Sequence, residues 1–191
     1  MTNAVAMQVY FLGKKLQMTL TQRVHLIDIY PDAHTYITST FHDGYVINEF
    51  TIACHGLAVF PGRVESLAIN GQLWTYDVVA RYIQSQTVVN RLHKIHLLAC
   101  NSANYDIASL AAKVSTNIRE TEVKGYVGSV YINFRYNDVY QLYLNSGCNR
   151  ASLERHIEQT GRFRVHTNKV PHYYCVVFKN GIIERQDYLK T

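Results

Sequence analysis

The sequence predicts a single α/β domain over residues 1–191, with a central, mostly parallel sheet, helices on both faces and a C-terminal β-hairpin. Three observations lead to this prediction. The chain has 191 residues, 48% of them apolar and 17% charged, which suits one compact domain. Short apolar runs alternate with amphipathic stretches through the centre of the chain, as in sheets whose strands are joined by helical crossovers. Residues 160–191 form a basic segment that ends in two apolar runs around Asn180-Gly181, a hairpin pattern.

The first half of the chain is expected to be rich in strands. Apolar or alternating runs predict strands at 6–12, 24–30, 36–41 and 50–54. Asp43-Gly44 suits a hairpin turn, and the run 50–54 is apolar throughout and ends at His55-Gly56, which is typical of a strand buried on both faces. A loop containing Pro61-Gly62 is expected next. A helix follows from about 75 to 86, because apolar residues recur there at spacings of three and four.

The second half is expected to continue with the same alternation. The ranges predicted as strands are 95–99, 123–127, 130–134 and 139–144, and those predicted as helices are 107–118 and 151–159. The run 95–99 ends at Cys100, and Gly161 is a plausible stop for the last helix. The final hairpin is predicted from strands at 173–178 and 182–188.

Composition excludes several classes of protein. No run of about 18 apolar residues occurs, so no transmembrane segment is expected, and the first residues lack the pattern of a secretory signal peptide. The net charge is +5, and the stretch from Thr160 to Ile183 contains no acidic residue. Its cations are Arg162, Arg164, Lys169 and Lys179. They form either a solvated basic face or a site for phosphate, nucleic acid or an acidic lipid surface.

The four cysteines do not form a metal or disulfide pattern. No CxxC pair occurs, and a domain of this size does not need disulfides, so free thiols and a reducing compartment are expected. Cys54 and Cys175 lie inside apolar runs and are predicted to be core residues. His93 and His96 precede Cys100, but their spacing on a strand does not give facing ligands, so no metal is expected.

His55 and Cys100 each follow an apolar strand directly, and 45 residues separate them, enough for one strand–helix crossover. Carboxyl ends of parallel strands meet at one edge of a sheet, where sites of α/β proteins lie. A cysteine nucleophile needs a base within reach, because the thiolate is the reactive form. Gly56 and Cys100 could also offer their backbone N–H groups to a developing oxyanion. The alternative is a buried strand-end cysteine beside a turn histidine.

A hydrophobic strand ending in His-Gly and a second ending in Ala-Cys resemble the signature of caspase-like (clan CD) cysteine peptidases. Within that group the sequence is most similar to the inositol-hexakisphosphate-activated cysteine protease domains of large bacterial toxins. The motif residues are 52–56 and 97–100, and the likeness extends over about 46–135, including 69–83 and 123–131. Ala99 stands where the toxin domains usually have Gly.

The resemblance implies a caspase-like three-layer fold and a cysteine endopeptidase that works through an acyl-enzyme. His55 would be the general base or ion-pair partner, Cys100 the nucleophile, and the Gly56 and Cys100 amides the oxyanion hole. It also implies inositol hexakisphosphate as a possible activator, bound by the basic surface of Arg162, Arg164, Lys169 and Lys179. The expected site of action is a cytosol, including that of a host cell reached from a bacterium without a classical signal peptide.

The expected partner is a protein or peptide substrate, with self-cleavage as one form of it. Five tyrosines gather between Tyr126 and Tyr143, and beside Arg135 they could stack on single-stranded nucleic acid. Such residues more often cover a strand face or a peptide groove, so no nucleic acid is expected. A catalytically silent caspase-like binding or scaffold domain remains the alternative to the enzyme.

Overall fold

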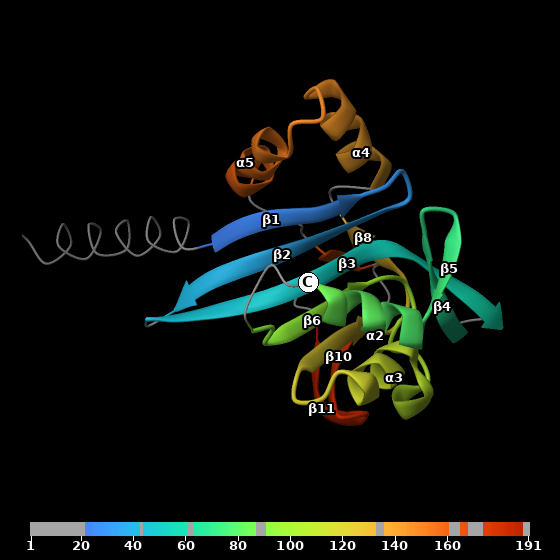
Figure 1. Ribbon diagram of the computed structural model, residues 1–191. Helices are drawn as coiled ribbons and strands as arrows, with labels where there is room; N and C mark the ends of the chain where they lie inside the picture. Colours follow the sequence, from blue (N-terminus) through green and yellow to red (C-terminus); the bar gives the residue numbers. More distant parts are fainter. Residues whose placement is uncertain are drawn as a thin grey trace, which may run out of the picture.

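The computed structural model of the chain describes residues 22–42, 44–60, 63–86, 91–132, 136–160, 165–167 and 174–188 (Figure 1). The predicted strand at 6–12 and three of the four predicted anion-site cations, Arg162, Arg164 and Lys169, lie outside these residues. The described strands are β1 Gln22–Ile29, β2 Ala33–His42, β3 Tyr45–Phe60, β4 Arg63–Ile69, β5 Gln72–Thr75, β6 Lys94–Leu98, β7 Glu122–Tyr126, β8 Val130–Ile132, β9 Val165–Thr167, β10 Tyr174–Lys179 and β11 Ile182–Tyr188. The α-helices are α2 Tyr76–Ser85, α3 Leu110–Asn117, α4 Tyr136–Asn145 and α5 Arg150–Thr160.

Nine strands form one mixed sheet in which the main order is β1-β2-β3-β6-β7-β10-β11, and β4 and β5 branch from β3. The predicted α/β class and C-terminal hairpin are confirmed. The prediction of a mostly parallel sheet is wrong, because among the strand pairs that the structure describes only β3–β6 and β6–β7 are parallel. The first three strands are joined by short turns, and a parallel pair would need a crossover of a dozen residues or more. They therefore pair antiparallel.

Strand β3 is much longer than predicted and does not end at His55-Gly56. It runs for 16 residues, to Phe60, and its last part pairs with β4, which in turn pairs with β5. The sequence prediction placed a loop around Pro61-Gly62 and missed both β4 and β5. The signal was present in β4, where Val64 and Leu67 are buried in the core, but the residues after Pro61-Gly62 were not interpreted as a strand.

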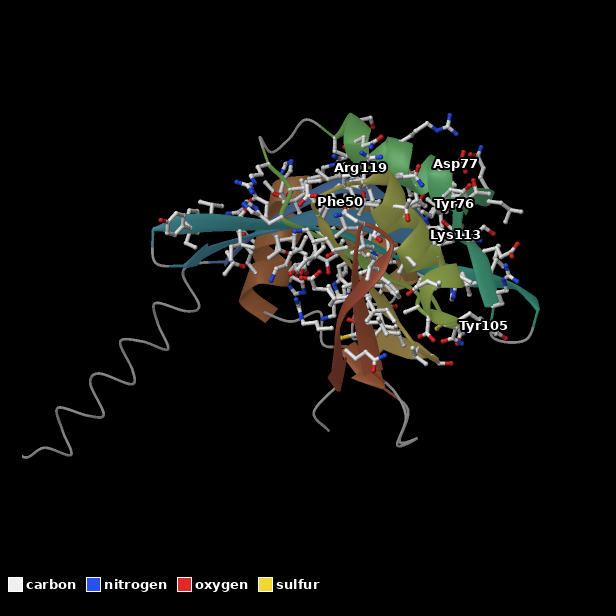
Figure 2. The ribbon with its side chains drawn as sticks, turned by 90° about the horizontal axis from the view of Figure 1, so that it is seen from below. Phe50, Tyr76, Asp77, Tyr105, Lys113 and Arg119 are labelled. Atoms are coloured by element: carbon white, nitrogen blue, oxygen red, sulfur yellow. The ribbon has the colours of Figure 1, made fainter. Side chains whose placement is uncertain are left out.

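Helices cover both faces of the sheet, as predicted. On one face, α2 and α3 pack against the strands, and Phe50, at the centre of β3, is fully buried there (Figure 2). Lys113 of α3 lies over the ring of Tyr76 at the start of α2, 5.7 Å from its centroid (Figure 2). On the other face, α4 and α5 lie together beside β1 and β2 (Figure 1). A smaller apolar cluster joins them to the sheet: Leu26, Tyr36, Val139, Leu153 and Ile157.

The segment predicted as a strand at 139–144 is helix α4. Val139 is buried against β1 and β2, and Leu142 and Tyr143 pack beside it, so the apolar side chains recur at three and four residues rather than two. The helix predicted at 107–118 is a 3-10 turn, Asp106–Ala108, followed by α3, whose first turn is capped by Ser109 Oγ accepting from Ala112 N–H at 3.2 Å. Within the described ranges, no helix has the length and apolar character needed to cross a membrane.

Candidate active site

His55 and Cys100 follow the end of the parallel ladder that joins β3 and β6. The parallel ladder between β3 and β6 pairs Glu49 with Lys94 and ends with Ala53 opposite Leu98, so paired residues are 45 apart in sequence. His55 and Cys100 are also 45 apart and lie two residues beyond the last pair. Strand β6 ends at Leu98, however, and Cys100 lies in the turn that follows, so the ladder itself does not pair these two residues.

The backbone at Gly56 confirms that these two segments lie against each other. A Cβ atom added to Gly56 would lie 2.4 Å from the carbonyl oxygen of Cys100 and 3.0 Å from Val64 Cγ2. Real Cβ atoms do not come so close to a backbone oxygen, so only glycine allows this approach. The sequence reasoning placed His55-Gly56 at a strand end, whereas the close approach occurs within a continuous strand.

The thiol of Cys100 is held by the first residue of β8. Its sulfur accepts a hydrogen bond from Val130 N–H at 3.3 Å, and the thiol donates to the Val130 carbonyl at 3.6 Å. The Cys100 side chain is half-buried. Both contacts come from the backbone of one residue, so they fix the position of the sulfur relative to β8. Val130 was not singled out by sequence reasoning, because a backbone contact leaves no signature in residue type.

The loop after Cys100 is tied to the end of β7 by hydrogen bonds. Asn101 N–H donates to the Gly128 carbonyl at 2.7 Å, with Asn101 in the left-handed region at φ 58°. Ser102 is fully buried, and its hydroxyl donates to the Leu97 carbonyl at 3.2 Å while accepting from Tyr126 N–H at 3.0 Å. Ser102 thus bridges β6 and β7 where their ladder has stopped, which fixes the position of Cys100.

The segment around His55 is positioned by β4 and by a carboxylate from the β1–β2 turn. His55 is exposed and pairs with Ala68 of β4. Asp32 accepts hydrogen bonds from Asn70 N–H at 2.7 Å and Gly71 N–H at 3.0 Å, which holds the turn that follows β4. Asn70 and Gly71 adopt φ values of 52° and 68°, so the left-handed turn suits this Asn-Gly pair. Asp32 is a positioning residue that sequence reasoning missed.

The other cysteines have different surroundings. Cys54 and Cys175 are buried, which confirms their prediction as core residues, and Cys148 is exposed. Burial raises the pKa of the Cys54 thiol far above its ordinary value, so this sulfur stays protonated at neutral pH. All four cysteines lie within the described residues, and none forms a disulfide. Cys100 therefore differs from Cys54 and Cys175 in having a polar, partly accessible setting.

A polar cluster lies near the amino end of β6, on the face of the sheet that carries Ala53 and Leu98. His96 Nε2 is 2.6 Å from the Tyr126 hydroxyl, and His96 Nδ1 is 3.5 Å from Glu49 Oε1. Burial alone would raise the pKa of Glu49, but the hydrogen bond with His96 and the charges of His96, Lys124 and Lys94 outweigh it and lower that pKa. No group of three or more His, Cys, Asp and Glu side chains within the described ranges is arranged to hold a metal ion.

Of the four cations predicted for an anion site, the structure describes Lys179 alone. Its ammonium is 3.3 Å from Glu120 Oε2, and Asn180 Nδ2 donates to the same carboxylate at 3.2 Å. Its neighbour in β10, Phe178, pairs with Val123 near the amino end of β7. Lys179 therefore lies at the end of the sheet opposite to Cys100 and already has an acidic partner.

No protein-family model, curated protein or solved structure matches this chain. The likeness to caspase-like peptidases therefore rests on the motif residues around His55 and Cys100.

Proposed function

We propose that this protein is a cysteine endopeptidase in which His55 and Cys100 form the catalytic pair. One observation carries the proposal: Gly56 packs against the backbone of Cys100, which makes the segment after His55 a direct neighbour of the thiol-bearing loop. The exposure of His55 and the half-buried thiol also support it, since both side chains must be reached by a substrate. The fully buried thiol of Cys54, by contrast, could not be reached by a substrate.

The chemistry proceeds by acyl transfer. His55 takes the thiol proton, and Cys100 Sγ attacks the peptide carbonyl carbon, so a C–S bond forms and the carbonyl oxygen becomes negative. The N–H groups of Gly56 and Cys100 are assigned to this oxyanion. The intermediate collapses with cleavage of the C–N bond, and His55 gives its proton to the leaving amine. Water, deprotonated by His55, then hydrolyses the thioester and restores the thiol.

Val130 has a role in this scheme. Its N–H donates to the sulfur, and its carbonyl accepts a hydrogen bond from the thiol S–H in the resting arrangement. For the proton to pass to His55, the S–H bond must turn away from Val130. The resting thiol is thus held in a form that needs a local rearrangement before it reacts.

Activation by inositol hexakisphosphate is the finer part of the proposal. Its support is the acid-free basic stretch containing Arg162, Arg164, Lys169 and Lys179. The ion pair between Lys179 and Glu120 limits the contribution of Lys179, so the three cations outside the described residues should contribute most. A polyanion that binds the folded state at one hundred times its dissociation constant would add about 2.7 kcal/mol of stability.

The test is labelling with a peptide acyloxymethyl ketone, with and without inositol hexakisphosphate, followed by mapping of the modified cysteine. The expected result is modification of Cys100, its loss in His55→Ala, and no modification of Cys54. Exposed Cys148 serves as the control for non-specific alkylation. Unmodified Cys100 under both conditions would overturn the enzyme and favour the silent binding domain. If inositol hexakisphosphate changes neither the labelling of Cys100 nor the melting temperature, it is not an activator, and the proposed peptidase function stands without it.

A further inference from the structure

Helices α4 and α5 form an insert between the paired short strands β8 and β9. The insert packs on β1 and β2 through the apolar cluster that includes Leu26, Val139 and Leu153. Figure 1 shows it beside β1, well separated from α2 and α3. The insert therefore packs on the edge of the sheet, and it follows β8, which begins at Val130, along the chain.

At the edge of the sheet, two carboxylates of α5 take the place of a neighbouring strand. Val24 N–H donates to Glu158 Oε1 at 2.9 Å, and Leu26 N–H donates to Glu154 Oε1 at 2.7 Å. Backbone groups of an edge strand otherwise face outward without a strand partner. Two strand residues span about 6.8 Å and four helical residues about 6.0 Å, so the spacing of the two glutamates matches that of the two amides.

The same glutamates also contact side chains of β1. His25 Nδ1 is 3.2 Å from Glu154 Oε1, and Arg23 Nη1 is 3.9 Å from Glu158 Oε2. Both basic side chains are more than half exposed, so these pairs add little. The bonds from backbone N–H to an ionised carboxylate are the stronger contacts, because charge-assisted hydrogen bonds exceed neutral ones in strength.

At the other end of the insert, β8 contacts the candidate nucleophile. Val130 holds the Cys100 sulfur through both its N–H and its carbonyl, and β8 then leads toward α4. Strand β8 precedes α4 and pairs with β9, which follows α5, so these two strands flank the insert along the chain. In this arrangement the Cys100 S–H group points at the Val130 carbonyl.

We infer that α5 is a latch on the edge of the sheet, and that its attachment to β1 through Glu154 and Glu158 keeps Cys100 in its resting contact with Val130. Release of the latch lets β8 move and frees the thiol. This regulation rests on the proposed function of Cys100, but its physical content is the reactivity of a thiol and can be measured without a peptide substrate.

The test compares three variants of the full chain with the wild type at one fixed pH. Glu154→Ala/Glu158→Ala removes both acceptors, and Glu154→Gln/Glu158→Gln keeps an uncharged acceptor oxygen in the same place. Arg155→Ala changes an exposed residue of the same helix and is the matched control. Two quantities are measured: amide hydrogen exchange by NMR, and the rate at which iodoacetamide alkylates Cys100, mapped by mass spectrometry. Circular dichroism verifies that each variant is folded.

In the Ala variant, the amides of Val24 and Leu26 should exchange about tenfold faster or more. The His25 amide is an internal control, because amides alternate in direction along a strand and this one faces β2. Alkylation of Cys100 should accelerate severalfold in the Ala variant and less in the Gln variant. Arg155→Ala should change neither quantity.

Unchanged exchange at Val24 and Leu26 would overturn the latch. Faster exchange with an unchanged alkylation rate would overturn its connection to Cys100. If both quantities change as expected in a protein that cleaves no peptide, the inference about the thiol stands and the proposed peptidase function falls. Should the Ala variant fail to fold, the Gln variant decides between the same outcomes.

Discussion

The two halves of the sheet share β3 and are built in different ways. On one side, β1, β2 and β3 are antiparallel and are joined by short turns, with α4 and α5 as their cover. On the other side, β3, β6 and β7 are parallel and are linked by segments that contain α2 and α3. The apolar cluster beneath α2 and α3 is also the larger of the two. The candidate catalytic residues His55 and Cys100 follow the last residue pair of the β3–β6 ladder, Ala53 and Leu98.

The largest effect is expected at the carboxyl end of β6. Cys100→Ala should lower peptide cleavage by at least about three orders of magnitude, because the nucleophile is lost, while the fold remains intact. Cys54→Ala, one residue before His55 in β3, should keep activity and lose about 1 to 2 kcal/mol of stability through lost packing. Steady-state rates and urea unfolding measure the two effects. Near-normal cleavage by Cys100→Ala would assign the chemistry to another residue.

His55 tests the contribution of the shared strand. His55→Ala should lower the cleavage rate by about two to four orders of magnitude, because the thiol loses its base. The residual rate should rise with pH, since thiolate then forms without help. His156→Ala, which removes an exposed histidine of α5, is the control and should leave the pH profile unchanged. An unaltered rate at neutral pH in His55→Ala would remove its assigned role.

Gly56→Ala tests the contact between β3 and the loop after β6. The added methyl group would lie 2.4 Å from the Cys100 carbonyl, so the two segments must separate. We expect loss of most activity and about 1 to 3 kcal/mol of stability. Gly147→Ala is the control, because Gly147 has φ 66° but open space around it. It should cost about 1 kcal/mol through backbone strain and leave activity unchanged. Equal effects of the two changes would contradict the close approach.

Core truncation compares the stability of the two halves. Leu97→Ala, in the large cluster under α2 and α3, should cost about 3 to 5 kcal/mol. Leu153→Ala, in the small cluster under α5, should cost about 2 kcal/mol, because the insert can shift to fill the space. Urea unfolding followed by fluorescence measures both. A larger loss for Leu153→Ala would mean that the insert is an integral part of the core.

The smallest effect concerns the polar cluster of Glu49 and His96. The pKa of Glu49 is lowered in the folded state, so its ionised form stabilises the fold above the ordinary titration range of a carboxyl group. This contribution, under about 1 kcal/mol for a partly exposed group, is lost as pH falls through the lowered pKa. Glu49→Gln should therefore be less stable than the wild type at pH 7, and the gap should close in acid. A gap that widens toward pH 3 would contradict the sign.

Much of the parallel half could be predicted from sequence. Helix α2, strand β6 and the C-terminal hairpin agree with their apolar periodicity, and Asn180-Gly181 marks the hairpin turn. The short turns that make β1, β2 and β3 antiparallel are visible in the sequence, but the sheet was still predicted to be mostly parallel. Helix α4 was predicted as a strand because its short apolar run fits both the period of two of a strand and the spacing of three and four of a helix.

The pairing of His55 with Cys100 stays a prediction, and the surroundings of the two residues could not be predicted from the sequence. His55 and Cys100 were selected because each follows an apolar run, and the structure brings the backbone of Gly56 against that of Cys100. The contacts of Val130 with sulfur and of Asp32 with the Asn70-Gly71 turn depend on backbone atoms brought together by the fold. Side-chain identity does not encode such contacts. The bonds from the edge of β1 to Glu154 and Glu158 are long-range for the same reason.

The position of β3 between two pairing partners has a consequence for the order of folding. The frame around His55 is assembled from residues close in sequence: β2, β3, β4 and the Asp32 contact all lie within residues 32–71. Cys100 joins only when β6 docks on β3, which closes a loop of 45 residues and is entropically slower. During synthesis the histidine side would therefore be complete before the thiol arrives. A chain that has completed the first step but not the second would have the strands around His55 formed while β6 and Cys100 have not yet docked.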